Sequence, residues 1–181
     1  MDGRLSVLFD TYEDKLYRLA RRLSANTEDA HDLVQETFLR AARSLTSIPD
    51  GSDAHAWLVR VLVNIRRDQW RKRTVRARAA AIVGRPTDAV AATAESALIA
   101  KRAVWSALDS LAPRRRAIVV LSEIDGMGPQ EIARLLGLAL MTVRWHLSMA
   151  RRELKQALVE YLGEHDENVV RSAPRRRSAA R

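Results

Sequence analysis

Apolar residues recur along this chain at three- and four-residue spacing, and no segment keeps up an alternation of apolar and polar residues. One apolar stripe covers residues 5–23, and a second covers residues 33–45 behind the helix-capping residue Asn26. A third segment, residues 54–73, is apolar nearly all round in its first half, which is typical of a helix inside a bundle. These patterns predict an all-α fold that opens with a three-helix module.

The later part of the chain predicts a second, smaller helical module. Residues 97–111 carry an apolar stripe, and a further helix is expected over 114–124. In residues 128–152, GPQEIARLLGLALMTVRWHLSMARR, one helix ends at Gly137 and the next begins near Leu140. A short helix, a glycine turn and a polar-faced helix predict a helix-turn-helix, although an ordinary helical hairpin has the same pattern.

Composition divides the chain into four parts. They are the first module, an alanine-rich linker, the second module and a disordered basic tail, at residues 1–74, 75–96, 97–163 and 164–181. The linker contains Gly84 and Pro86 and has weak periodicity, and the tail has few apolar residues.

Charge favours a polyanionic partner. The chain has 31 Lys and Arg against 22 Asp and Glu, which gives a net charge of +9 and a pI of about 10.9. Residues 66–73 hold five basic residues and one acidic residue, so positive charge is concentrated at one end of the third helix. The partner is expected to be nucleic acid or an anionic membrane surface.

Several classes of protein lack support in the sequence. There is no cysteine, the four histidines lack ligand spacing, and neither a phosphate-binding loop nor a nucleophile motif is present. No metal, no cofactor and no enzymatic activity are therefore expected. The N-terminus does not resemble a secretion signal, and no apolar run is long enough to insert into a membrane. The expected location is the cytoplasm.

Two surfaces of the first module stand out. On the third helix a polar stripe is formed by Arg60, Asn64, Arg67 and Arg71. A solvated face explains the arginines, but asparagine is a poor helix former with an amide suited to reading bases, so nucleic acid is the favoured interpretation. On the second helix an acidic and amide-bearing face is formed by Asp32, Gln35, Glu36 and Leu39. That face would repel DNA, and it indicates a protein partner with basic groups or a plain solvated surface.

The second helix of the helix-turn-helix has a polar face suited to DNA. Its members are Arg144, Trp145, Ser148, Met149 and Arg152. Trp145 is either a contact to a thymine methyl or sugar, or an aromatic residue at the edge of the core. Residues 114–116, three arginines that include Arg115, are expected to hold phosphates from the supporting helix.

Two segments together resemble a known family. Residues 32–43, DLVQETFLRAAR, and 56–73, AWLVRVLVNIRRDQWRKR, are similar to region 2 of sigma-70-type transcription initiation factors. Residues 108–152, from LDSLAPRRRAIVVL to TVRWHLSMARR, are similar to region 4. With only these two regions and a short linker, the chain resembles the extracytoplasmic function (ECF) group.

The resemblance implies partners and roles for these surfaces. Core RNA polymerase would bind Asp32, Gln35, Glu36 and Leu39, and an anti-sigma factor is an expected regulator. Residues 48–53, with Arg60, Asn64, Arg67 and Arg71, would read the −10 element of promoter DNA as a melted strand. Arg115 and the polar face of the helix-turn-helix would read the −35 element as duplex. Ala139 and Met141 depart from the family's usual residues, a capping residue such as serine and a glycine.

Two other functions stay open at this stage. A one-component transcription regulator would use the first module as a sensor or dimerisation bundle and bind its operator alone. An RNA-binding or membrane-surface helical protein would use the arginines without reading bases.

Overall fold

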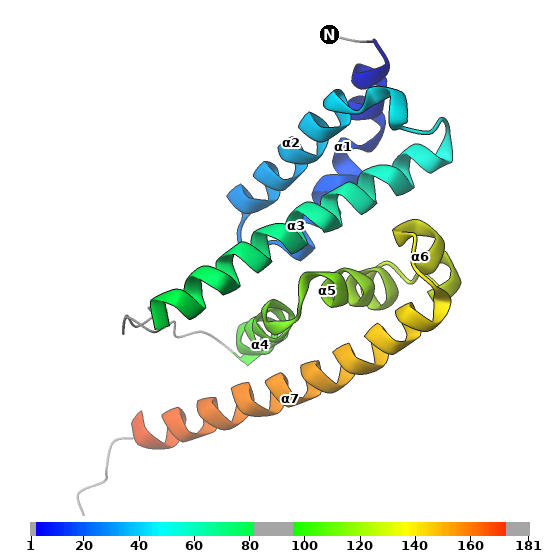
Figure 1. Cartoon of the computed structure of the whole chain (residues 1–181). Helices are drawn as coiled ribbons and strands as arrows, with labels where there is room; N and C mark the ends of the chain where they lie inside the picture. The colour runs from blue at the N-terminus through cyan, green and yellow to red at the C-terminus, as the bar shows by residue number, and fades with distance from the viewer. Residues whose placement is uncertain (1–2, 82–95, 173–181) are drawn as a thin grey trace, which may run out of the picture.

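The computed structural model describes residues 3–81 and 96–172, and every regular element within them is a helix (Figure 1). Residues 82–95, most of the predicted linker, and residues 173–181, the end of the predicted tail, lie outside the described residues. The helices form two modules in the predicted order, so the all-α, two-module fold is confirmed.

The first module contains three long helices and a short 3-10 turn. These elements are α1 (Gly3–Leu23), α2 (Thr27–Arg43), η1 (Leu45–Ser47) and α3 (Ser52–Ala81). Their apolar stripes meet in a core in which Leu16, Leu33 and Leu58 are completely buried. Burial of each such side chain contributes about 1.5–3 kcal/mol. The side chain of Asn26 accepts a 2.7 Å hydrogen bond from the N–H of Asp29, so the predicted cap does begin α2.

The connection between α2 and α3 is held in place by α1. The Arg4 guanidinium donates to the carbonyl oxygens of Leu45 and Ile48 at 3.2 and 2.6 Å, and it pairs with the Asp50 carboxylate at 2.8 Å. The Leu45 oxygen also accepts from the Ile48 N–H at 3.4 Å, and Arg4 adds a side-chain donor to both main-chain oxygens. Arg4 therefore ties the connection between α2 and α3 to α1.

The second module contains the helix-turn-helix. Its elements are α4 (Ser96–Ser110), α5 (Pro113–Val119), η2 (Val120–Ile124), α6 (Pro129–Leu136) and α7 (Leu140–Ser172). Gly137 ends α6 with a φ of 64°, and the Leu138 N–H donates to the Ala133 carbonyl oxygen at 2.9 Å. Glycine adopts this left-handed cap without steric cost.

The helix after Pro113 differs from the prediction in its second half. Residues Val120–Ile124 form a π turn, in which the Asp125 N–H donates to the Val120 carbonyl oxygen at 3.1 Å. The wider turn leads into Asp125, whose carboxylate pairs with the Arg22 guanidinium of α1. A π turn has no residue signature at the sequence level, so the pattern predicted an unbroken α-helix.

The two modules pack directly on each other. Figure 1 shows α3 lying along α5 and α6, and the contacts between α3 and each of these helices are extensive. The buried apolar residues of both modules form one continuous cluster. Sequence patterns gave no indication of this packing.

Two helix ends lie beyond their predicted limits. Helix α3 continues to Ala81, past the expected end of the first module at residue 74. Alanine and arginine are strong helix formers, and they dominate these added residues. Helix α7 continues to Ser172, past the predicted start of the tail at residue 164. That stretch contains no proline before Pro174.

Candidate functional site

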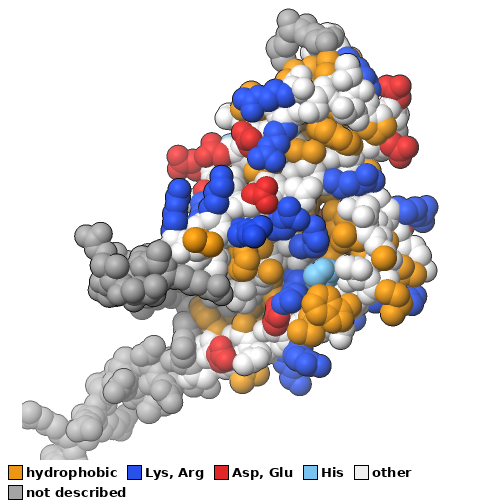
Figure 2. Space-filling view, viewed as in Figure 1, with side chains coloured by type: hydrophobic (Ala, Val, Ile, Leu, Met, Phe, Trp, Pro, Cys, Tyr) orange, Lys and Arg blue, Asp and Glu red, His pale blue; other side chains and the backbone are white. Residues whose placement is uncertain are grey.

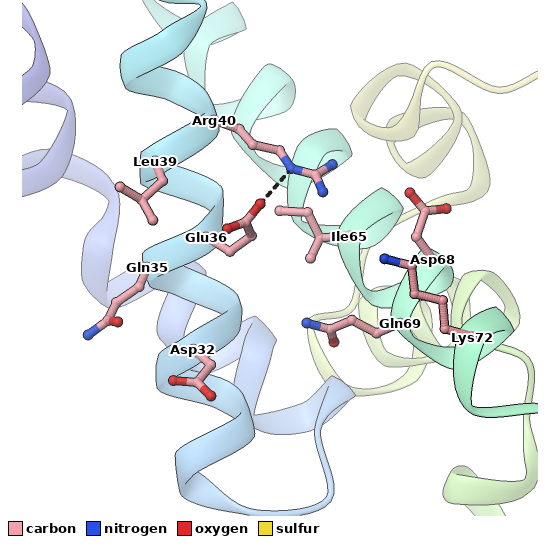
Figure 3. A pocket seen from close by; sticks show the side chains of 9 residues that line it. All are labelled: Asp32, Gln35, Glu36, Leu39, Arg40, Ile65, Asp68, Gln69 and Lys72. Atoms are coloured by element: carbon pink, nitrogen blue, oxygen red, sulfur yellow. Dashed lines mark hydrogen bonds and ion pairs between the residues drawn. The ribbon is translucent and has the colours of Figure 1, made fainter. Parts of the chain in front are cut away.

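The acidic and amide-bearing face of α2 lines a groove between α2 and α3. The groove has a volume of about 410 Å³, and all four residues predicted for this face line it. They are Asp32, Gln35, Glu36 and Leu39 (Figure 3). The leucine is 52% exposed and adds an apolar side chain to this otherwise polar face.

The other wall of the groove was not predicted. It is built by four residues of α3: Ile65, Asp68, Gln69 and Lys72 (Figure 3). Arg40 of α2 completes the lining. The α3 members recur at three- and four-residue spacing, which marks a helical face but does not identify the helix opposite. Their alignment with α2 comes from the packing of the two helices.

Charge in this groove is more balanced than the sequence suggested. The Arg40 guanidinium donates to the Glu36 carboxylate at 3.0 Å, one helical turn away, and Lys72 lies on the opposite wall. Asp32 is exposed on the same face of α2. The surface therefore offers both signs of charge, amides and an exposed leucine, a combination suited to a protein partner.

The predicted stripe on α3 is divided by the second module. Arg60 and Arg67 are exposed, as Arg71 is, but together with the half-buried Asn64 they line an open pocket of about 300 Å³ between α3 and the second module. The rest of the lining is Val63, Arg114, Leu136, Gly137 and Leu138. The structure thus brings three of the four stripe residues together and separates them from the fourth.

Arg60 has partners that the sequence did not reveal. Its Nε donates to the Leu135 carbonyl oxygen at 3.0 Å, and its Nη2 donates to the Arg134 carbonyl oxygen at 3.1 Å. Both acceptors belong to the last turn of α6, at the negative end of the helix dipole, although the Arg134 oxygen also accepts from the Gly137 N–H at 3.3 Å. A guanidinium is therefore strongly favoured at this point.

The outward face of α7 matches its prediction closely. Arg144, Trp145, Ser148 and Arg152 are exposed and Met149 is half-buried, while the opposite face packs into the core. The core-facing members are Val143, Leu147 and Ala150. Figure 2 shows Lys and Arg side chains gathered near the boundary where α3 meets α5 and α6.

Trp145 is an exposed aromatic residue with a cationic neighbour. It is 53% exposed, and the Arg115 guanidinium lies over its ring at 5.5 Å from the centroid. The same guanidinium is paired with Glu153. Arg115 and Trp145 therefore form one surface unit, with Arg115 oriented by a carboxylate of α7.

His146 lies beneath this unit. Burial, followed by the charges of Arg115 and Arg114, lowers the pKa of His146 below its ordinary value of 6.5. Its Nδ1 is buried without a hydrogen-bond partner. The neutral form is favoured, which keeps a further positive charge away from the arginines.

Of the three arginines at residues 114–116, Arg116 does not fit its predicted role in holding phosphates. It is 3% exposed and turns into the boundary between the modules, where its Nε donates to the Arg22 carbonyl oxygen at 2.7 Å. Its guanidinium also pairs with Asp109. The sequence pattern grouped Arg116 with Arg114 and Arg115 because the three basic residues are adjacent. In a helix, however, adjacent side chains point in different directions around the axis.

The loop at residues 48–53 is only partly open to a ligand. Ile48 is 3% exposed and belongs to the core, while Pro49, Asp50 and Gly51 are exposed. The Tyr12 hydroxyl donates to the Gly51 carbonyl oxygen at 3.3 Å, which adds a second tie to α1. Any base-binding pocket here would have to use the exposed members.

Comparison with known proteins assigns the chain to a family. Residues 8–89 match the family model of sigma-70 region 2, and residues 101–154 match that of sigma-70 region 4. The RNA polymerase sigma-E factor of Streptomyces coelicolor is 34% identical over 151 residues, which cover 82% of each chain. The ECF RNA polymerase sigma factor SigE of Mycolicibacterium smegmatis is 38% identical over 172 residues. This chain belongs to the ECF group of the sigma-70 family.

Coverage and fold agree with this family. The alignment with the Mycolicibacterium factor covers 90% of this ECF chain but 63% of the longer relative. The sigma factor RpoE of Bartonella quintana, solved with the anti-sigma factor NepR, superposes with a TM-score of 0.59 at 28% identity. That match covers 83% of this chain and 93% of the other. Within the described residues of this ECF chain, no helix combines the length and apolar character needed to cross a membrane.

Proposed function

We propose that this chain is a promoter-specificity subunit of RNA polymerase. It binds the core enzyme through the groove between α2 and α3, and it directs the enzyme to promoters by reading a −10 and a −35 element. The chain has no chemistry of its own in this role, because the polymerase performs catalysis. Its place of action is the cytoplasm, where the polymerase and the DNA are found.

A single observation carries the proposal: two separate sigma-70 regions occur in one short chain, in the family's order. A one-component regulator needs only a helix-turn-helix and a sensor or dimerisation module. It has no need for a groove of mixed charge with an exposed leucine on its other module. The groove supports binding to a protein partner, and membership of the sigma-70 family points to RNA polymerase as that partner.

The DNA surfaces divide the reading of the promoter between them. On α3, Asn64 supplies an amide for base edges, while Arg67 and Arg71 supply charge for the phosphates of a melted strand. On α7, Arg144 and Ser148 approach base edges in the major groove of duplex DNA, and Trp145 packs against a thymine methyl or sugar. Arg115 holds a phosphate beside them.

A regulatory partner is also part of the proposal. The Bartonella relative was solved with an anti-sigma factor, and its fold matches most of this chain. We infer that an anti-sigma factor sequesters this chain in the same manner. Such a protein would compete with the core enzyme for the chain.

The experiment that tests the proposal is assembly with purified core RNA polymerase. The chain is mixed with core enzyme, and complexes are resolved by size-exclusion chromatography. A stoichiometric complex is expected, and duplex promoter DNA should be retained by the complex but only weakly by the chain alone. Tight, sequence-specific binding by the chain alone, with no complex, would instead identify a one-component regulator.

A further inference from the structure

Two exposed apolar side chains lie on the same face at the start of α7. Met141 is 69% exposed and Trp145 is 53% exposed. The two residues are four positions apart in one helix, so their Cβ atoms are about 5–6 Å apart. Single exposed apolar residues are common on protein surfaces, but this pair gives an otherwise polar helix face an apolar surface of its own.

Both residues lie in the first two turns of α7. The helix begins at Leu140, and the Val143 N–H donates to the Ala139 carbonyl oxygen at 3.1 Å, which places Met141 in the first turn. In helix-turn-helix proteins, the N-terminal residues of the second helix contact base edges in the major groove of DNA. The apolar pair is therefore located in the part of α7 that is suited to reading bases.

The Trp145 ring is restrained by two neighbours. The Arg115 guanidinium lies over the ring at 5.5 Å from its centroid, and the His146 ring packs edge-on against it with centroids 4.9 Å apart. Arg115 is in turn paired with Glu153 of α7. A ring that is ordered before binding loses less conformational entropy when it meets a ligand.

The charges around the pair match duplex DNA. Residues 140–152 contain three arginines and no acidic residue, and Arg144 is exposed directly beside Trp145. The major groove is bordered by phosphates, and thymine presents an apolar methyl group inside it. An apolar pair surrounded by positive charge is therefore complementary to a groove that contains thymines.

The spacing of the pair fits two thymines. Four residues of an α-helix extend about 6 Å along its axis. Successive bases of a DNA strand are about 3.4 Å apart along the duplex. Side chains at positions 141 and 145 therefore reach methyl groups on base pairs that are one or two steps apart.

We propose that Met141 and Trp145 together determine specificity for the −35 element by packing against the methyl groups of two nearby thymines. The inference rests on the proposed function for the kind of ligand, duplex promoter DNA. It adds Met141 to the reading surface, and it names the chemical group that is read. The glycine that is usual in the family at position 141 has no side chain to pack against a methyl group, so the apolar pair distinguishes this chain.

Replacement of thymine by deoxyuridine tests the proposal, because it removes the methyl group and keeps the base pair. Duplexes with a random central segment are selected for binding to the full chain at low salt, and in parallel for binding to its complex with core polymerase. The selected duplexes should share two thymines that are one or two base pairs apart. These duplexes are then remade with deoxyuridine at the two positions, and the dissociation constants of both forms are measured.

The expected effect follows from the burial of methyl groups. One buried methyl group corresponds to about a fourfold change in affinity, so two correspond to about fifteenfold. The parent chain should bind the thymine duplex about fifteenfold more tightly than the uracil duplex. Met141→Ala and Trp145→Ala should each lower this ratio to about fourfold, because one methyl contact is left. The double variant should lower it to about one, and any ratio that it retains measures the effect of uracil on DNA shape.

Val159→Ala is the matched control. Val159 is another exposed apolar residue of α7, at 64% exposure, and it lies beyond the arginine-rich turns. This variant should keep the fifteenfold ratio of the parent. Because Met141 and Trp145 are exposed, their alanine variants should keep the helical circular dichroism of the parent, and the ratio measured for the parent carries the test without them.

Three results would overturn the proposal. One is equal affinity of the parent for thymine and uracil duplexes. Another is a ratio that Met141→Ala and Trp145→Ala leave unchanged, as expected if the pair contacts the sugar–phosphate backbone or a protein instead. The third is a failure of both the chain and its complex with core polymerase to enrich any sequence.

The test separates this inference from the proposed function. The selection with the chain alone contains no polymerase, so a chain that fails to bind core enzyme would refute the proposed function while the thymine-to-uracil ratio still decides how bases are read. Conversely, a chain that binds core enzyme and directs transcription, but binds thymine and uracil duplexes equally, would refute the reading of methyl groups alone.

Discussion

Arg116 anchors the second module to the end of α1, and its replacement by methionine should destabilise the whole chain. The side chain is 4% exposed, and its Nε donates to the Arg22 carbonyl oxygen at 2.7 Å. Methionine keeps most of the aliphatic stem and so limits the cavity, but it removes every donor.

The size of the effect follows from these partners. A hydrogen bond from a charged donor contributes about 1.5–3 kcal/mol, and Arg116→Met leaves the Arg22 oxygen without this partner. The ion pair with Asp109 adds little, because that carboxylate is 47% exposed and surface pairs contribute about 0–1 kcal/mol. Relief from burying a charge offsets part of the loss. We expect the free energy of unfolding to fall by about 2 kcal/mol.

Urea unfolding followed by far-ultraviolet circular dichroism measures this loss. Arg151→Met is the matched control, because Arg151 is 65% exposed and makes a similar pair with Glu123 at 2.9 Å. Its substitution should change the free energy of unfolding by less than about 0.5 kcal/mol. If Arg116→Met and Arg151→Met have the same stability, Arg116 does not hold the modules together and the reasoning fails.

Four further variants test other parts of the account. Ala139→Ser supplies a side-chain cap at the start of α7, where the Ala139 carbonyl oxygen already accepts from the Val143 N–H at 3.1 Å. Urea unfolding should show that the free energy of unfolding rises by about 1 kcal/mol. No rise would mean that the serine fails to cap the helix. Asn64→Ala should reduce transcription from promoters matched at −10 about tenfold and leave core binding unchanged, since one amide contact to a base is worth about 1–3 kcal/mol. Transcription by the variant that is unchanged at both matched and mismatched promoters would exclude a reading role. Gln35→Ala combined with Glu36→Arg should abolish co-purification with core enzyme while circular dichroism stays unchanged, and retained co-purification would remove the groove from the interface. Folding lowers the pKa of His146, so the folded chain binds fewer protons than the unfolded chain as pH falls through 6.5, and the free energy of unfolding should decrease from pH 7 to pH 5. His146→Gln should flatten that decrease. An unchanged slope in the variant would contradict the role of burial.

Local patterns predicted the helices and the faces that they expose. The cap at Asn26 and the glycine that ends α6 act within one helical turn, so their residue types were sufficient. The faces of α2 and α7 follow from the helical period, and the structure keeps Leu39 and Trp145 exposed.

The contacts that sequence reasoning missed involve main-chain acceptors. Arg60 bonds to carbonyl groups 74 and 75 residues away, and Arg4 bonds to carbonyl groups 41 and 44 residues away. Every residue has a carbonyl group, so no residue type marks these partners. The polar stripe on α3 was therefore predicted without any neighbour, whereas the structure places Arg60, Asn64 and Arg67 beside the second module.

Transcription from a genomic DNA library by purified core RNA polymerase, with and without this chain, tests the central claim most directly. The account predicts that the chain adds a restricted set of transcripts whose start sites lie downstream of shared −10 and −35 sequences, and that these transcripts disappear when the chain is omitted. Identical transcripts with and without the chain, at concentrations where the chain is folded, would contradict its assignment as a promoter-specificity subunit.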